Sequence, residues 1–124
     1  MGYRINHLHL KTPDPRKTAQ WYVDYLGAKV VSENEAPDGR TSFRLDLHGL
    51  SLNVTGFVEG QALEQEYGME HLAVDADDFD NEVERIKASG VTILEERNLT
   101  DGRKVCFFEG PEGVRLEFME MRPT

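Results

Sequence analysis

The chain has 124 residues, a formal net charge of −9 at pH 7 and a hydrophobic fraction of 39%. This length predicts one compact domain, or two half-size modules that share a core, and excludes a second large domain. The acidic balance disfavours nucleic acids and anionic membranes as partners, which leaves small molecules or proteins, and we expect a small-molecule substrate.

Further features of the sequence predict a soluble, cytoplasmic protein. No apolar run approaches the ~20 residues of a membrane span, and the N-terminus lacks the basic segment and apolar stretch of a secretory signal. The single cysteine, Cys106, cannot form a disulfide within the chain, which agrees with a reducing compartment. We interpret Cys106 as a small apolar residue of a strand rather than as a catalytic thiol.

The first half of the chain predicts the element order βαβββ. A strand over residues 3–11 places His7 and His9 on one face. A helix is expected from Pro15, since proline is favoured at the first helical position, to about Leu26. Strands follow over residues 28–35, 40–47 and 50–55.

The second half repeats this order after a polar linker over residues 57–68. A strand over residues 69–74 precedes a helix that starts after Asp77 or Asp78. Strands follow over residues 91–98, 103–109 and 114–121.

The two halves also correspond residue by residue. His7 and His71 are 64 positions apart, and so are Asn53 and Glu117. A fixed spacing of this kind indicates one unit written twice. We therefore predict the α+β class, with two tandem βαβββ modules at residues 1–56 and 69–124 of a single domain, forming an incomplete barrel.

Each predicted helix covers one face of its sheet and leaves the other face uncovered. The uncovered faces collect mostly polar residues: His7, His9, Ser51, Asn53, Thr55, His71, Arg115, Glu117 and Met119. Two imidazoles and a carboxylate from separate strands match the ligand set of Zn²⁺, Ni²⁺, Mn²⁺ or Fe²⁺. His7, His71 and Glu117 are thus candidate metal ligands, whereas His48 falls in a tight turn, where we expect it to be solvated.

Several motifs together resemble those of a known group. They are Asn6-His7-Leu8, the helix from Asp14-Pro15 to Leu26-Gly27, His71-Leu72-Ala73-Val74, and the stretch from Asp101-Gly102 to Glu117. With these motifs the chain resembles the vicinal oxygen chelate superfamily, which comprises glyoxalases, bleomycin-resistance proteins and extradiol dioxygenases. The resemblance covers nearly the whole chain. It implies one divalent metal per site, with His7, His71 and Glu117 as ligands.

Asn53 departs from the glyoxalase I pattern, in which a glutamate is expected at this position. A carboxamide cannot take up a proton at neutral pH, so only Glu117 is left as the carboxylate base of an isomerase. Asn53 remains a candidate for a weak neutral metal ligand or for a hydrogen bond to a metal-bound water.

The resemblance also implies roles for the other polar residues if the site is catalytic. The metal would chelate two neighbouring oxygens of a small substrate, such as a thiol conjugate, and Glu117 would shuttle the proton. His9 is a candidate second base or supporting hydrogen-bond donor. Arg44 and Arg115 are candidates to hold a substrate carboxylate, and Ser51 and Thr55 are further candidate substrate contacts.

Three alternative functions are open from the sequence. Two histidines and a glutamate also form the facial triad of Fe(II) dioxygenases. A drug-sequestering protein of the bleomycin-resistance type needs no metal, which the intact His7, His71 and Glu117 set argues against. We place a fosfomycin-resistance enzyme behind these, because His9 stands where that group would have a threonine.

The oligomeric state follows from the resemblance, which implies a homodimer. The sequence does not decide whether a site forms within one chain or takes ligands from two subunits.

Overall fold

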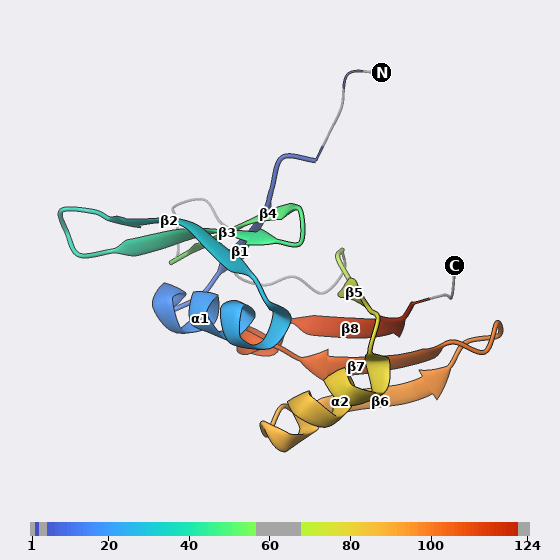
Figure 1. Cartoon of the computed structure of the whole chain (residues 1–124). Helices are drawn as coiled ribbons and strands as arrows, with labels where there is room; N and C mark the ends of the chain where they lie inside the picture. The colour runs from blue at the N-terminus through green and yellow to red at the C-terminus, as the bar shows by residue number, and fades with distance from the viewer. Residues whose placement is uncertain (1, 3–4, 57–67, 122–124) are drawn as a thin grey trace. The chain divides into compact units, whose positions relative to one another are not determined.

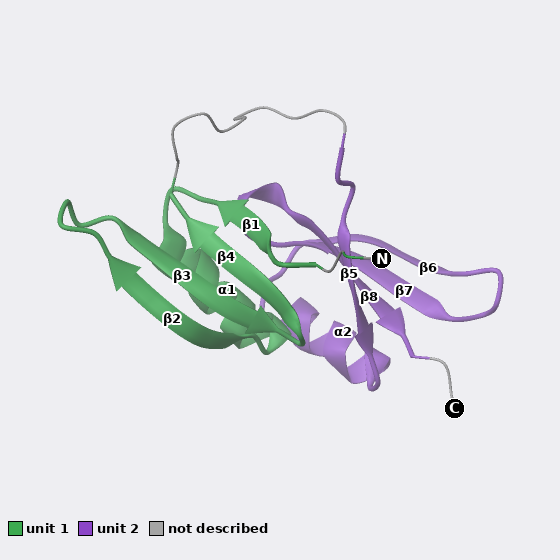
Figure 2. Cartoon of the chain, turned by 90° about the horizontal axis from the view of Figure 1, so that it is seen from above, with its two compact units in different colours: residues 1–64 green, residues 65–124 purple. Residues whose placement is uncertain are grey.

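The computed structural model describes residue 2, residues 5–56 and residues 68–121. The chain forms two compact units, Met1–Glu64 and Gln65–Thr124, coloured separately in Figure 2. Most of the predicted linker, over residues 57–68, lies outside the described residues. Among the helices of the described part, none has the length and apolar character needed to cross a membrane.

Unit 1 has the predicted βαβββ order (Figure 1). Its elements are β1 (Leu8–Lys11), α1 (Pro15–Leu26), β2 (Lys29–Glu35), β3 (Thr41–Leu47) and β4 (Leu50–Thr55). The strands form one sheet in the order β1-β4-β3-β2, in which β1 and β4 are parallel and the other pairs antiparallel.

Helix α1 forms where the sequence supplies both of its ends. The side chain of Asp14 accepts a hydrogen bond from the backbone N–H of Lys17 at 3.1 Å, which satisfies one of the free donors of the first turn. Gly27 ends the helix in the left-handed conformation at φ 70°. The buried side of α1, including Tyr22 and Leu26, packs against β3 and β4, so one face of the unit 1 sheet is covered.

Unit 2 repeats the order (Figure 1). Its elements are β5 (Leu72–Ala76), α2 (Phe79–Ala88), β6 (Ile93–Asn98), β7 (Lys104–Glu109), a short 3-10 turn (Pro111–Gly113) and β8 (Arg115–Glu120). The sheet order is β5-β8-β7-β6, with β5 parallel to β8. The predicted α+β class with two βαβββ modules is therefore confirmed.

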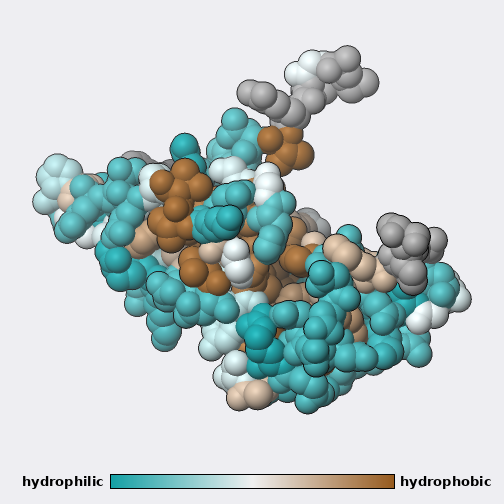
Figure 3. Space-filling model, in the orientation of Figure 1, coloured by the Kyte–Doolittle hydropathy of each residue, from teal (hydrophilic) through white to brown (hydrophobic). Residues whose placement is uncertain are grey.

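Helix α2 is amphipathic and covers one face of the unit 2 sheet. Its buried residues are Phe79, Val83 and Ile86, and the helix packs against β8. The outer side of α2 is hydrophilic in Figure 3. The opposite face carries the polar side chains of Arg115 and Glu117, as the alternation in β8 predicted, together with Val105 and Phe107 of β7.

Both first strands begin later than predicted. The ladder of β1 starts at the Leu8–Leu52 pair and that of β5 at the Leu72–Leu116 pair. His7 and His71 thus lie immediately before their strands. In unit 1, the described residues 5–7 before β1 are exposed, with Ile5 at 81%.

The turn between β3 and β4 is a two-residue hairpin loop. His48 and Gly49 both have positive φ, 52° and 98°, as a type I′ turn requires. The ring of His48 is exposed, as predicted, but its Nε2 also donates a hydrogen bond to the carbonyl of Leu26 at 2.6 Å. The β7–β8 hairpin contains one more residue, since eight residues lie between the paired Arg44 and Asn53 and nine between the paired Phe107 and Glu117.

Candidate functional site

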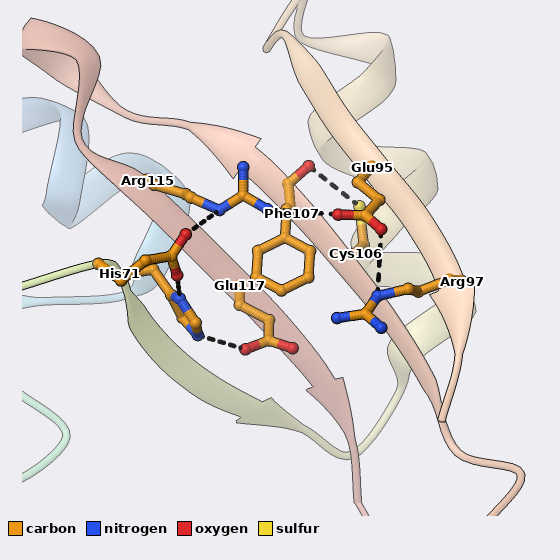
Figure 4. Close-up of polar contacts among 8 residues, drawn as sticks. His71, Glu95, Arg97, Cys106, Phe107, Arg115 and Glu117 are labelled. Carbon is orange, nitrogen blue, oxygen red and sulfur yellow. Dashed lines mark hydrogen bonds and ion pairs between the residues drawn. The ribbon is translucent and has the colours of Figure 1, made fainter. Parts of the chain in front are cut away.

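The uncovered face of unit 2 brings His71 and Glu117 together (Figure 4). Glu117 lies in β8 directly opposite Phe107 of β7, and Ala73 of β5 is its neighbour on the other side. Its neighbours in sequence, Leu116 and Phe118, are buried on the side of α2. The strand alternation therefore turns the Glu117 carboxylate away from the helix.

Glu117 and His71 form a close polar pair. His71 Nε2 lies 2.9 Å from Glu117 Oε1, and Glu117 is only 6% exposed. The His71 ring meets the Phe107 ring edge to face, with centroids 5.1 Å apart. Because Phe107 shields both groups from water on one side, a carboxylate and an imidazole are held next to each other at the rim of a partly apolar surface.

Around this pair lies a network of charged residues that the sequence patterns do not indicate. Glu70 accepts a hydrogen bond from His71 Nδ1, and Arg115 Nε lies 3.0 Å from Glu70 Oε1. The Arg115 contact is an ion pair without the directionality of a hydrogen bond, since Nε has no hydrogen-bond partner. The guanidinium also stacks over Phe107 at 4.2 Å and reaches Glu95 Oε2 at 3.3 Å.

The sequence singles out Arg115, but only weak signals point to Glu70 and Phe107. Glu70 is adjacent to His71 in sequence, and Phe107 occupies the strand position beside Glu117. Neither fact predicts which way a side chain turns. Arg97 completes the network by pairing with Glu95 at 3.1 Å.

The uncovered face of unit 1 carries His9, Asn53 and Thr55. His9 lies beside Asn53 in the parallel β1–β4 ladder, and its Nε2 is 2.6 Å from Thr55 Oγ1. Asn53 Oδ1 is buried and has no hydrogen-bond partner among the described residues. An unpaired buried acceptor is uncommon in native proteins and suits a ligand that supplies a positive charge or a proton.

Arg44 and Ser51 lie on this same face of unit 1. Arg44 is directly opposite Asn53 in the β3–β4 ladder, and it is exposed. Within the described ranges Arg44 makes no ion pair, in contrast to Arg115. Ser51 is opposite Asp46.

His7 is exposed, and its Nδ1 is 2.6 Å from Asn6 Oδ1. Its ring centroid lies 6.5 Å from that of His9. Among the residues that the structure describes, no three His, Cys, Asp or Glu side chains are grouped so that they could hold a metal ion. The candidate metal ligands are therefore His71 and Glu117 in unit 2, and His7 and the Asn53 amide in unit 1.

Cys106 lies on the other face of the unit 2 sheet. It is 0% exposed, and burial raises the pKa of its thiol to about 11. A neutral buried thiol is a poor nucleophile. The interpretation of Cys106 as an apolar strand residue agrees with this environment.

Two βαβββ units, each presenting a histidine before its first strand and a carboxylate or amide in its last, define a class of paired-module α+β proteins. A family model described as the Glyoxalase/Bleomycin resistance protein/Dioxygenase superfamily matches residues 4–118. The chain belongs to this superfamily.

Relatives of similar length carry enzyme names. The lactoylglutathione lyase of Neisseria meningitidis serogroup A is 28% identical over 128 residues, covering 96% of this chain and 91% of that protein. The metallothiol transferase FosB of Lysinibacillus sphaericus is 26% identical, covering 92% of this chain and 79% of that protein.

The fold also matches solved structures. The crystal structure of the fosfomycin resistance protein FosX from Listeria monocytogenes aligns with a TM-score of 0.77 at 22% identity, covering 98% of this chain and 96% of that one. At this identity the match supports the fold alone.

Proposed function

We propose that the protein is a divalent-metal-dependent enzyme of the glyoxalase type, acting as a lyase or isomerase on a small oxygenated substrate such as a thiol conjugate. The observation that carries this proposal is the buried Glu117 carboxylate held against His71 on the uncovered face of unit 2. The family membership and the enzymatic names of the relatives support it.

The residues present fit a divalent metal ion. Glu117 is buried beside an imidazole, and the buried Asn53 Oδ1 lacks a partner. A divalent ion bound by nitrogen and oxygen ligands would satisfy both kinds of group. We assign His7, His71 and Glu117 as ligands, and Asn53 as a neutral oxygen ligand or a hydrogen-bond acceptor for bound water. A FosX structure was solved with Mn(II), and we propose a divalent ion for this chain as well.

When bound, the metal would polarise two neighbouring oxygens of the substrate as a Lewis acid. Glu117 then serves as the proton carrier between adjacent carbons, because Asn53 at the corresponding position of unit 1 cannot take up a proton. Phe107, packed beside Glu117, limits the access of water to this carboxylate.

His9 is the second candidate base, and Thr55 orients it. Thr55 Oγ1 donates its one proton to the carbonyl of Gly56 at 2.9 Å, so it must accept from His9 Nε2. His9 therefore carries a proton on Nε2, which leaves Nδ1 as the acceptor nitrogen. Thr55 thus acts on the substrate through His9.

Arg44 is the cation that we assign to an acidic group of the substrate. It lies opposite Asn53, is exposed and has no ion pair among the described residues. Ser51 on the same strand as Asn53 is a further hydrogen-bonding group for the substrate. We further propose a homodimer, in which His7 and the pair of His71 and Glu117 come from one chain or from two.

Metal content tests this proposal directly. We expect near one divalent ion per site in untagged wild-type protein by elemental analysis, and a large loss in His71→Ala. The matched control is His48→Ala, which removes an exposed histidine of the β3–β4 turn that is not among the proposed ligands. Equal metal content in the wild type and His71→Ala would refute the enzyme proposal.

A thiol transferase is the second candidate, favoured by the FosB relative and by Asn53 in place of a second carboxylate base. Turnover of a glutathione hemithioacetal with nickel or zinc identifies the isomerase, and thiol addition to fosfomycin identifies the transferase. Oxygen uptake with a catechol and iron would identify a dioxygenase. Drug binding that is indifferent to chelators would identify a sequestering protein.

A further inference from the structure

We propose that Glu70 is a positioning residue that fixes the ring of His71, with Arg115 fixing Glu70 in turn. This inference rests on the proposed function, in which His71 is a metal ligand. The contacts that carry it join side chains of unit 2.

The contacts assign a different task to each ring nitrogen of His71. Nδ1 is hydrogen-bonded to Glu70 Oε2, and Nε2 faces Glu117 Oε1 at 2.9 Å. A carboxylate can only accept a hydrogen bond, so Nδ1 must carry a proton. Nε2 is then the nitrogen that can bind a metal ion shared with Glu117. A carboxylate behind the ring also makes the imidazole a stronger donor to a metal.

Glu70 could not hold the ring by itself, because its side chain is 64% exposed. Arg115 supplies the constraint. Its Nε lies 3.0 Å from Glu70 Oε1, while the other oxygen of that carboxylate is bonded to His71. Both oxygens of Glu70 are thus engaged.

Arg115 is itself held in place from two sides. Its guanidinium stacks on Phe107 at 4.2 Å, and it reaches Glu95 at 3.3 Å. Phe107 is 4% exposed and is a fixed part of the sheet. The contacts therefore link the Phe107 ring to the Arg115 guanidinium, the guanidinium to the Glu70 carboxylate, and that carboxylate to the ring of His71. Figure 4 labels Phe107, Arg115 and His71.

This network also bears on the choice of substrate contact. Arg115 has two carboxylate partners, Glu70 and Glu95, so its charge is already neutralised. Arg44 has no ion pair within the described part of the chain. The two arginines of the predicted site thus take different tasks: Arg115 positions a ligand, and Arg44 meets the substrate.

The test compares Glu70 with Glu95, since both carboxylates contact Arg115 but only Glu70 contacts His71. Zinc affinity is measured by competition with a chromophoric chelator in the wild type, Glu70→Gln, Glu70→Leu and Glu95→Leu. We expect Glu70→Leu to weaken zinc binding about 10- to 100-fold, the range typical of groups that orient a ligand. Glu70→Gln keeps an acceptor for Nδ1 and should fall between the wild type and Glu70→Leu. Glu95→Leu should stay within about threefold of the wild type.

A spectroscopic readout separates positioning from a general loss of structure. In zinc-loaded protein with ¹⁵N-labelled histidine, the His71 signal should show a protonated Nδ1 and a metal-bound Nε2. We expect the Nδ1–H resonance to move upfield in Glu70→Gln and not in Glu95→Leu. Both glutamates are exposed, so the variants should keep the wild-type unfolding midpoint.

Equal loss of zinc affinity in Glu70→Leu and Glu95→Leu, or no loss in Glu70→Leu, would overturn the positioning role. If His71→Ala binds zinc as tightly as the wild type, the proposed function fails as well. Loss of zinc binding in His71→Ala together with full binding in Glu70→Leu would refute the positioning role alone.

Discussion

The pairing of His71 with Glu117 makes a quantitative prediction for the metal-free protein. Glu117 is 6% exposed in the wild type, and truncation of His71 to alanine removes the partner that lies 2.9 Å from its carboxylate. The contact is an ion pair when His71 carries a proton on both ring nitrogens, and such charged contacts contribute about 1.5–3 kcal/mol, whereas an unpaired buried charge costs more than a lost pair. The His71 side chain is 29% exposed, so solvent screening brings the expected loss of unfolding free energy toward the lower end of this range. We expect His71→Ala to lower the free energy of unfolding by about 2 kcal/mol.

Glu117→Leu should behave differently. It removes the charge and places an apolar side chain beside Phe107, so we expect a change within about 1 kcal/mol. In the double variant, the truncation of His71 leaves no Glu117 carboxylate without its partner. The coupling free energy from the double-mutant cycle should therefore be about 1–2 kcal/mol.

Urea unfolding in the presence of a chelator measures all four corners of this cycle. His9→Ala is the matched control, because His9 is an exposed imidazole on a sheet face without a buried carboxylate partner. Its cost should stay under about 1 kcal/mol. Additive effects of His71→Ala and Glu117→Leu, with no coupling, would show that the two side chains are not paired in the metal-free protein.

Three further predictions follow from the folds of the units. Cys106 should resist alkylation by iodoacetamide at pH 8 in the folded protein and should react after unfolding in urea. Burial raises the pKa of its thiol to about 11, so only about one part in a thousand is thiolate at that pH. Modification of the native protein at the rate of a free thiol would contradict this prediction. Ile86→Ala should lower the free energy of unfolding by about 2–5 kcal/mol, whereas Val31→Ala, at a 61% exposed position, should change it by less than about 0.5 kcal/mol, as measured by urea denaturation. Gly27→Ala should cost about 1 kcal/mol, since the αL position at φ 70° strains any residue with a Cβ, and a neutral result by thermal unfolding would show that the helix end rearranges.

The duplicated architecture could be predicted because it depends on patterns with clear periods. Alternation in residues 50–55 and 115–120 marked the last strand of each unit, and it placed Asn53 and Glu117 on the uncovered faces. The proximity of His71 to Glu117 depends in addition on the parallel pairing of β5 with β8, which the alternation does not indicate. Strand periodicity is decided by backbone geometry, which the sequence encodes locally.

The ion network around Arg115 could not be predicted in this way. Whether Glu70 turns toward His71 or toward solvent depends on Arg115, which is 45 positions away in sequence. The position of Arg115 depends in turn on stacking against Phe107. Such choices among rotamers are made by contacts between strands, and they leave no period in the sequence. The hydrogen bond from His48 to the carbonyl of Leu26 could not be predicted for the same reason, because it joins residues 22 positions apart.

The extra residue of the β7–β8 hairpin leaves the strand order of the two units the same, while different side chains lie at equivalent positions. Phe107 corresponds to Arg44, because each lies opposite the last-strand residue that we assign to the metal, Glu117 and Asn53 respectively. Had the insertion fallen inside a strand, every later side chain would have swapped faces. Because the extra residue lies in the hairpin loop, Phe107 and Arg44 occupy equivalent positions, each opposite the last-strand residue of its unit. In the proposed function, Phe107 shields the Glu117 carboxylate in unit 2 and Arg44 binds an acidic group of the substrate in unit 1, and the strand order is the same in both sheets.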